Sequence, residues 1–125
     1  MVGMPSPDIA AFLRGHFNSV WALELLIFLK DHADQAWPGD SLVTALRTSE
    51  TIVSMSIGTL LAGGLIAKEA DGGVRYAPAS EDLSRLVDVT QALYAKKPNA
   101  VRRVIVGASA QGLSAFANSF KLRSE

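Results

Sequence analysis

The fold is decided by residues 40–78, which read DSLVTALRTSETIVSMSIGTLLAGGLIAKEADGGVRYAP. The first half of this stretch places apolar residues three and four positions apart, which is typical of helices that pack on one side. Asp40 can cap a helix from Ser41 to about Arg47, because a carboxylate accepts the free N–H groups of a first helical turn. The break after Arg47 predicts that a second helix follows at once.

Thr48 and Ser49 are both candidate caps for this second helix, and Gly63 and Gly64 are expected to end it. Its inward stripe consists of Val53, Ile57, Leu60 and Leu61. The residues on the opposite side of the helical wheel are Thr51, Ser54, Met55, Gly58 and Thr59. The sequence therefore predicts two helices joined by a tight turn, the second with an exposed face of small side chains.

Beyond Gly64 the apolar residues alternate with polar ones, which predicts two short strands. Asp71 and Gly72 supply the turn between them, and Pro78 ends the second strand. If both turn residues take left-handed conformations, as in a two-residue hairpin turn, Lys68 lies opposite Arg75. The two cations would then share one face of the ribbon.

Two helices are expected before this stretch. Ser6, Pro7 and Asp8 resemble a helix start, and the apolar residues Ile9 to Phe17 follow at helical spacing. Ser19 can cap a further helix from Val20 to about His32, whose apolar residues cover nearly its whole circumference. A helix of that kind belongs at the centre of the core.

Further helices are expected after Pro78. Ser80 begins a long amphipathic stretch that runs to about Lys97 with the apolar stripe Leu83 to Tyr94, and Pro98 interrupts it. A shorter helical segment then carries Val101, Val104 and Ile105, and a last one carries Leu113, Phe116, Ala117 and Phe120.

The composition fits one domain, residues 1–125, with a core of its own. Twelve Lys and Arg balance twelve Asp and Glu. This excludes a protein that binds nucleic acid non-specifically through a positive charge over its whole surface, but it does not exclude a local basic patch. Without cysteine the chain has no disulfide framework and no thiolate metal site. The apolar run at residues 20–29 is too short to span a bilayer and the first residues lack a secretory pattern, so a cytoplasmic protein is expected.

The stretch from Asp40 to Pro78 resembles the winged helix-turn-helix family, the fold of many bacterial transcription regulators of the MarR and PadR type. The likeness is carried by Leu42 to Leu46 in the supporting helix, by Leu60 with Gly64-Leu65-Ile66 at the end of the recognition helix, and by residues 71–76 in the wing. It implies a mainly α fold with a winged helix-turn-helix core at 19–79. It also implies that the helices at 6–18 and 80–123 build a dimer interface, to which the long apolar stripes lend support.

The resemblance further implies a DNA-binding transcription regulator that acts as a homodimer on double-stranded DNA, with recognition helix 49–63 in the major groove and wing 65–77 on the flanking backbone. The residues expected at bases or phosphates are Arg47, Ser49, Thr51, Ser54, Met55, Thr59, Lys68 and Arg75. The recognition helix departs from the family pattern because residues 49–64 contain no Lys or Arg, and Glu50 adds a negative charge. A winged-helix module that docks on another protein is therefore the alternative.

A group of cations flanks Pro98, and its members are Lys96, Lys97, Arg102 and Arg103. They would add phosphate contacts if the C-terminal helices reach the groove side. The other interpretation is a solvated helix junction, since most charge groups merely solvate a surface. Both remain open from the sequence.

No catalytic motif and no phosphate-binding loop is visible, so neither an enzyme nor a cofactor is expected. His16 and His32 lie too far apart for a metal site and are expected near helix ends. Glu24 interrupts an apolar helix and is expected to be partly buried with a capping or ion-pair partner. Trp21 and Trp37 are expected in the core and at its edge.

Overall fold

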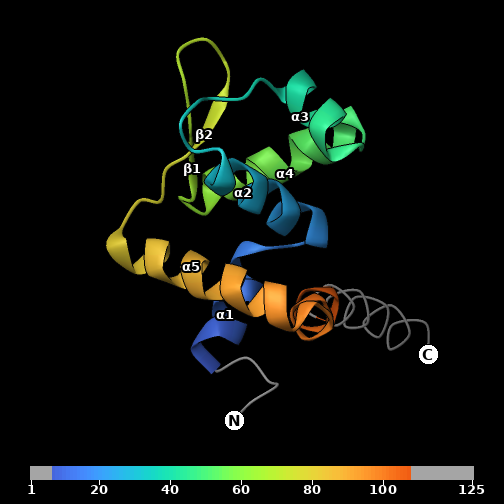
Figure 1. Ribbon diagram of the computed structural model, residues 1–125, viewed down its shortest axis with the longest axis vertical. Coiled ribbons are helices and arrows are strands. Elements are labelled where there is room, and N and C mark those ends of the chain that lie inside the picture. Colours follow the sequence, from blue (N-terminus) through green and yellow to red (C-terminus); the bar gives the residue numbers. More distant parts are fainter. Residues whose placement is uncertain (1–6, 108–125) are drawn as a thin grey trace, which may run out of the picture.

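The computed structural model describes residues 7–107, which fold into helices and one small antiparallel sheet (Figure 1). The elements are α1 (Pro7–His16), α2 (Val20–Asp31), α3 (Gly39–Leu46), α4 (Glu50–Ala62), β1 (Ile66–Lys68), β2 (Val74–Tyr76) and α5 (Glu81–Lys96). Residues 98–107 form a further helical segment. The prediction of a mainly helical fold with a β-hairpin is confirmed. The expected last segment, Leu113 to Phe120, lies outside the described residues.

Helix α2 lies at the centre of the core, as its apolar circumference predicts. Five of its residues are buried, namely Ala22, Leu23, Leu25, Leu26 and Leu29. Helix α4 and strand β2 pack against it, whereas α5 contacts α1. Figure 1 shows α2 between the α3, α4 and hairpin layer on one side and α5 on the other. Helix α4 is therefore held from behind by the helix with the most buried residues between positions 7 and 107.

Three of the helices begin at serine caps that the sequence marks. The side-chain oxygens of Ser19, Ser49 and Ser80 each accept a backbone N–H from three residues further on, at 3.1 to 3.3 Å. Of the two candidate caps for α4, Ser49 is the one used. Each such cap satisfies a backbone donor that the helix leaves free and contributes about 1 kcal/mol.

The expectation that Asp40 caps α3 is wrong. This helix begins at Gly39 after Pro38, and the Asp40 carboxylate accepts the neighbouring N–H of Ser41 at 2.9 Å. The start moves because Trp37 is tied to β2 by two backbone hydrogen bonds with Val74, of 2.8 and 2.9 Å. This pairing is an isolated antiparallel bridge between Trp37 and Val74, which the sequence pattern does not indicate.

The hairpin turn also differs from the expected one. Ala67 pairs with Arg75 and Lys68 pairs with Val74. The N–H of Glu69 also donates to the carbonyl oxygen of Gly73 at 2.7 Å, so three residues, 70–72, rather than two form the turn. Gly72 alone among them has a positive φ, of 95°, whereas Asp71 holds the turn by accepting the N–H of Gly73 at 3.0 Å. Because neighbouring residues of a strand point to opposite faces, Lys68 and Arg75 lie on opposite faces of the ribbon.

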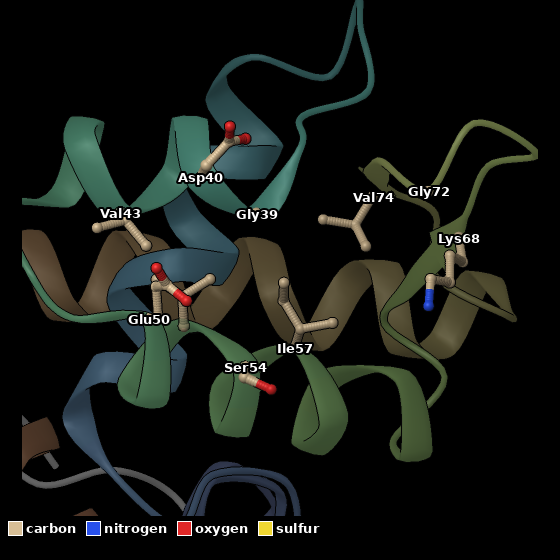
Figure 2. A pocket seen from close by; sticks show the side chains of 10 residues that line it. Gly39, Asp40, Val43, Glu50, Ser54, Ile57, Lys68, Gly72 and Val74 are labelled. Carbon is tan, nitrogen blue, oxygen red and sulfur yellow. The ribbon is translucent and has the colours of Figure 1, made fainter.

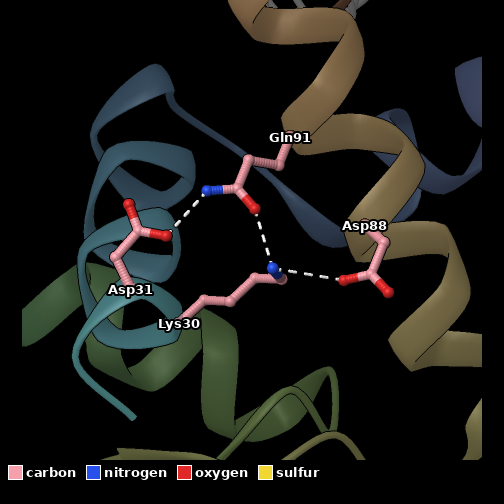
Figure 3. Close-up of polar contacts among 4 residues, drawn as sticks. All are labelled: Lys30, Asp31, Asp88 and Gln91. Carbon is pink, nitrogen blue, oxygen red and sulfur yellow. Dashed lines mark hydrogen bonds and ion pairs between the residues drawn. The ribbon is translucent and has the colours of Figure 1, made fainter.

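A polar cluster joins the end of α2 to the middle of α5 (Figure 3). The Lys30 Nζ lies 3.2 Å from the Asp88 carboxylate and donates to Gln91 Oε1 at 2.7 Å. The Gln91 amide in turn donates to Asp31 at 2.9 Å. These contacts fix the direction in which α5 crosses α2.

The apolar stripe of α5 packs within the protein. Val87 and Thr90 are buried, and the leucines of the stripe with Tyr94 lie half-buried against the core. Much of this stripe is therefore covered within the protein itself, and less of it is left for a dimer interface than the sequence alone indicates. In the part of the chain from residue 7 to residue 107, no helix has the length and apolar character needed to cross a membrane.

Candidate functional site

Helix α4 presents one uncovered face to solvent. Thr51, Ser54, Met55 and Gly58 are exposed on it, and Met55 is 63% exposed. The opposite side, with Val53, Ser56 and Leu60, is buried. Thr59 lies at the edge of the uncovered face, half-buried, with its hydroxyl donating to the carbonyl oxygen of Met55 at 3.1 Å. The face is thus a shallow polar strip with a methionine near its centre.

A cleft of about 370 Å³ borders this face on the hairpin side (Figure 2). Its apolar floor is formed by Val43, Val53, Ile57 and Val74. Asp40, Glu50, Ser54 and Lys68 contribute its polar groups. Two of the lining residues are acidic and one is basic, so the cleft has no positive excess that would attract a phosphate by charge alone.

Only one of the two expected hairpin cations lines this cleft. Lys68 is exposed and has no hydrogen-bond or ion-pair partner within residues 7–107. Arg75 lies on the other face of the ribbon, where its guanidinium is 3.9 Å from the Glu69 carboxylate. The expectation of two cations on one ribbon face is wrong, because the turn has three residues.

A second cleft, of about 350 Å³, borders α4 on the side of α1. Arg14 and His16 from the end of α1 line it together with Thr59 from α4 and Gly63, which follows α4. Arg14 was not among the expected site residues, because no spacing in the sequence connects the end of α1 with α4. Tertiary packing alone brings them together.

Ser49 and Arg47 occupy the turn between α3 and α4. The Ser49 hydroxyl oxygen is engaged in capping α4. Arg47 ends α3 in a left-handed conformation, with φ of 55°, and its side chain is exposed. Arg47 lines a depression of about 410 Å³ with Trp21 and Glu24, away from both clefts beside α4.

The uncovered face of α4 has to be interpreted from its own geometry. Comparison of the chain with protein-family models, with curated proteins and with solved structures finds no match. What the geometry provides is a helix that is buried on one side, bare on the other and flanked by a cleft on each edge.

The cations around Pro98 line neither of these clefts. Lys96, Lys97, Arg102 and Arg103 are all exposed, and Figure 2 shows α5 behind α4, away from its uncovered face. The Arg102 guanidinium lies 5.5 Å from the centre of the Tyr94 ring and donates to Asn99 at 3.4 Å. This arrangement fits a solvated helix junction. The expected phosphate contacts of these four cations required that they lie near α4, and the structure does not place them there.

Tyr94 also supplies the partner of Glu24. Its hydroxyl donates to the half-buried carboxylate, so the partner is a phenol, and the expected cap or ion pair is wrong. Burial raises the pKa of Tyr94 above its ordinary value, and the hydrogen bond to Glu24 raises it further. Trp21 beside them is 38% exposed, so its expected core position is wrong, whereas Trp37 is half-buried at the core edge as expected.

Both histidines lie at helix ends. The Nδ1 atoms of His16 and His32 are 3.2 and 2.8 Å from the carbonyl oxygens of Phe12 and Phe28, in the last turns of α1 and α2. Within residues 7–107, no group of three or more His, Cys, Asp or Glu could hold a metal ion.

Proposed function

We propose that the chain is a DNA-binding transcription regulator that inserts α4 into the major groove and lays the β1–β2 hairpin along the flanking backbone. The observation that carries this proposal is the uncovered face of α4, presented by a helix whose other side is fixed against α2 and α3. A DNA-reading helix needs this combination, because its side chains must reach base edges from a rigid support.

The order of the elements supports the proposal. Helix α2, the strand-like segment at Trp37, helices α3 and α4, and the β1–β2 hairpin follow one another as in winged helix-turn-helix regulators. Together with the sequence resemblance of residues 40–78 to MarR-type and PadR-type proteins, this order supports α3 as the supporting helix. Helix α4 then takes the recognition position and the hairpin that of the wing.

The side chains on the face can read bases without a net charge. The hydroxyls of Thr51 and Ser54 both donate and accept hydrogen bonds, and Met55 offers an apolar contact for a thymine methyl group. Gly58, with no side chain, allows a base or sugar to approach the helix closely. Lys68 provides an exposed cation for a phosphate on the hairpin side of this region.

A homodimer completes the proposal. Two copies of α4 placed about 34 Å apart would enter successive major grooves on one side of the duplex, and each would read half of a pseudo-palindrome. Helix α1 and the C-terminal helices are the proposed dimer elements, as in the regulators that the sequence resembles.

The test adds a carboxylate to the uncovered face. Met55→Glu should weaken binding of a fluorescently labelled duplex at least about tenfold, because it brings a negative charge against the phosphates of the groove. Val89→Glu is the matched control, since Val89 is 44% exposed on α5. Light scattering on all three proteins checks that mass is unchanged. Equal DNA affinity of Met55→Glu and the wild type would overturn the proposal.

A second candidate is docking on another protein through the same face. It is favoured by the carboxylates of Asp40 and Glu50 in the hairpin-side cleft, and by the absence of Lys and Arg from residues 49–64. An exposed methionine at the centre of a neutral surface suits an adaptable protein contact. Wild-type protein that fails to bind any duplex at low salt would favour this function.

A further inference from the structure

The edge of α4 that faces α1 carries charge differently from the edge that faces the hairpin. Asp40 and Glu50 line the hairpin-side cleft with Lys68, so carboxylates there outnumber cations. The α1-side cleft is lined by Arg14 and His16, and no carboxylate is among its lining residues. A phosphate therefore meets less repulsion beside α1 than beside the hairpin.

The two clefts lie on opposite flanks of the uncovered face. Ser54 lines one cleft and Thr59 lines the other. Five residues along an α-helix correspond to a rotation of about 140°, so these two positions mark the two edges of the face. In Figure 2, α4 runs below α3 with the hairpin at its end, and the ribbon of α1 appears on the side of α4 away from α3.

Packing fixes the end of α1 against α4. The His16 ring lies so close to Gly63 that a Cβ atom on Gly63 would come within 2.8 Å of His16 Cδ2. Phe12, Leu13 and Phe17 anchor the same end of α1 in the core. Arg14 is exposed between these anchors and has no hydrogen-bond or ion-pair partner in the described part of the chain. Its backbone is thus held at a constant place relative to α4, while its guanidinium is free to bind.

A helix in the major groove has a phosphate strand on each side, because the groove is about 12 Å wide and a helix with its side chains fills it. Cations on both flanks of α4 would each reach one strand. Lys68 occupies one flank, and Arg14 occupies the other.

We propose that Arg14 binds the phosphodiester backbone on the α1 side of α4, so that α1 takes part in DNA binding together with the hairpin. The inference rests on the proposed function, since it needs α4 in the groove. The guanidinium is suited to this contact because its planar N–H groups can bind two phosphate oxygens at once. Its charge also offsets the partial negative charge at the C-terminal end of α1.

The test measures how the affinity for a labelled random-sequence duplex depends on salt. Each lost phosphate contact lowers the slope of log affinity against log salt by about 0.9. Arg14→Ala and Lys68→Ala should each lower the slope by about this amount per bound protomer, and the double variant by about twice as much. Arg14→Lys should keep the slope. Arg85→Ala is the control, because Arg85 is equally a surface cation but lies on α5, paired with Asp82 at 2.9 Å.

The outcomes separate this inference from the function on which it rests. A wild-type protein without salt-dependent DNA binding would overturn both. The role of Arg14 would be overturned, and the proposed function left standing, by a different result. In that case the wild type binds DNA and Lys68→Ala has a reduced salt slope, but Arg14→Ala has the same slope as the control Arg85→Ala. Thermal unfolding of each variant confirms that it folds. Arg14→Gln removes the charge but keeps most of the side-chain length, so its salt slope is a second measurement of the lost phosphate contact.

Discussion

Gly64 is the residue at which the backbone most clearly requires glycine. Its φ is 73°, and it follows α4 with Gly64 N–H donating to Leu61 and Leu65 N–H donating to Leu60, both at 3.1 Å. This is the Schellman arrangement, which satisfies the last carbonyl groups of a helix. The paired glycines at 63–64 are therefore a local signal, and the sequence predicts the end of α4 for that reason.

Gly64→Ala should lower the free energy of unfolding by about 1 to 2 kcal/mol, because a Cβ atom disfavours the left-handed conformation. Gly58→Ala is the control, since a Cβ there meets no atom within 4 Å. In the middle of a helix, that change should raise stability by about 0.5 to 1 kcal/mol. Urea unfolding measures both, and a Gly64→Ala protein as stable as the wild type would contradict the assigned backbone.

Tyr94 links stability to alkaline pH. Burial and the bond to Glu24 raise the pKa of Tyr94 in the folded protein above its ordinary value of 10.0. The protonated phenol is therefore favoured by folding, so this contribution is complete below about pH 10 and is lost as pH rises through the folded-state pKa. Burial also raises the pKa of Tyr76, which acts in the same direction.

Tyr94→Phe should accordingly lose less stability than the wild type as pH rises above about 10, while being less stable at neutral pH, where Glu24 has lost its donor. Denaturant unfolding at several pH values gives both differences. An alkaline loss as steep in Tyr94→Phe as in the wild type would show that Tyr94 is not the group responsible.

At the scale of elements, local signals predict where helices and strands lie better than how they pair. Serines before helices and glycines after them act within a few residues, so the starts of α2, α4 and α5 could be predicted. The hairpin register depends on whether Asp71 takes a left-handed conformation, and the sequence cannot decide that. Because the turn has one more residue than expected, Lys68 and Arg75 lie on opposite faces of the ribbon, and each face carries one of the two cations instead of both.

The contact between α2 and α5 gives a prediction at this scale. Lys30 and Asp88 form an ion pair in which 23% and 60% of the side chains are accessible. Since solvent screens such a pair, a double-mutant cycle with Lys30→Ala and Asp88→Ala should give a coupling energy below about 1 kcal/mol. Lys30→Ala alone should cost more than Asp88→Ala, because it also removes the bond to Gln91. A coupling energy above about 2 kcal/mol would mean that the pair is shielded from water.

At the scale of the whole molecule, the helical wheel predicted most of the uncovered face of α4, since Thr51, Ser54 and Met55 follow from periodicity alone. The cations around that face could not be predicted. Arg14 lines a cleft with Thr59, which is 45 positions further along the chain, only because α1 packs beside α4. Arg47 lines a depression on another side. Long-range packing of this kind has no local sequence signal, so the fold was more predictable than the charge distribution at its candidate site.

Recognition of double-stranded DNA by α4 is tested most directly by a fluorescence anisotropy titration. Duplexes enriched from a random pool and unselected duplexes are titrated with wild-type protein at two salt concentrations. We expect binding that weakens with salt and a preference of about a thousandfold or more for the enriched sequence. Absence of binding at low salt, even at protein concentrations near the roughly 10⁻⁴ M limit of non-specific association, would contradict the account.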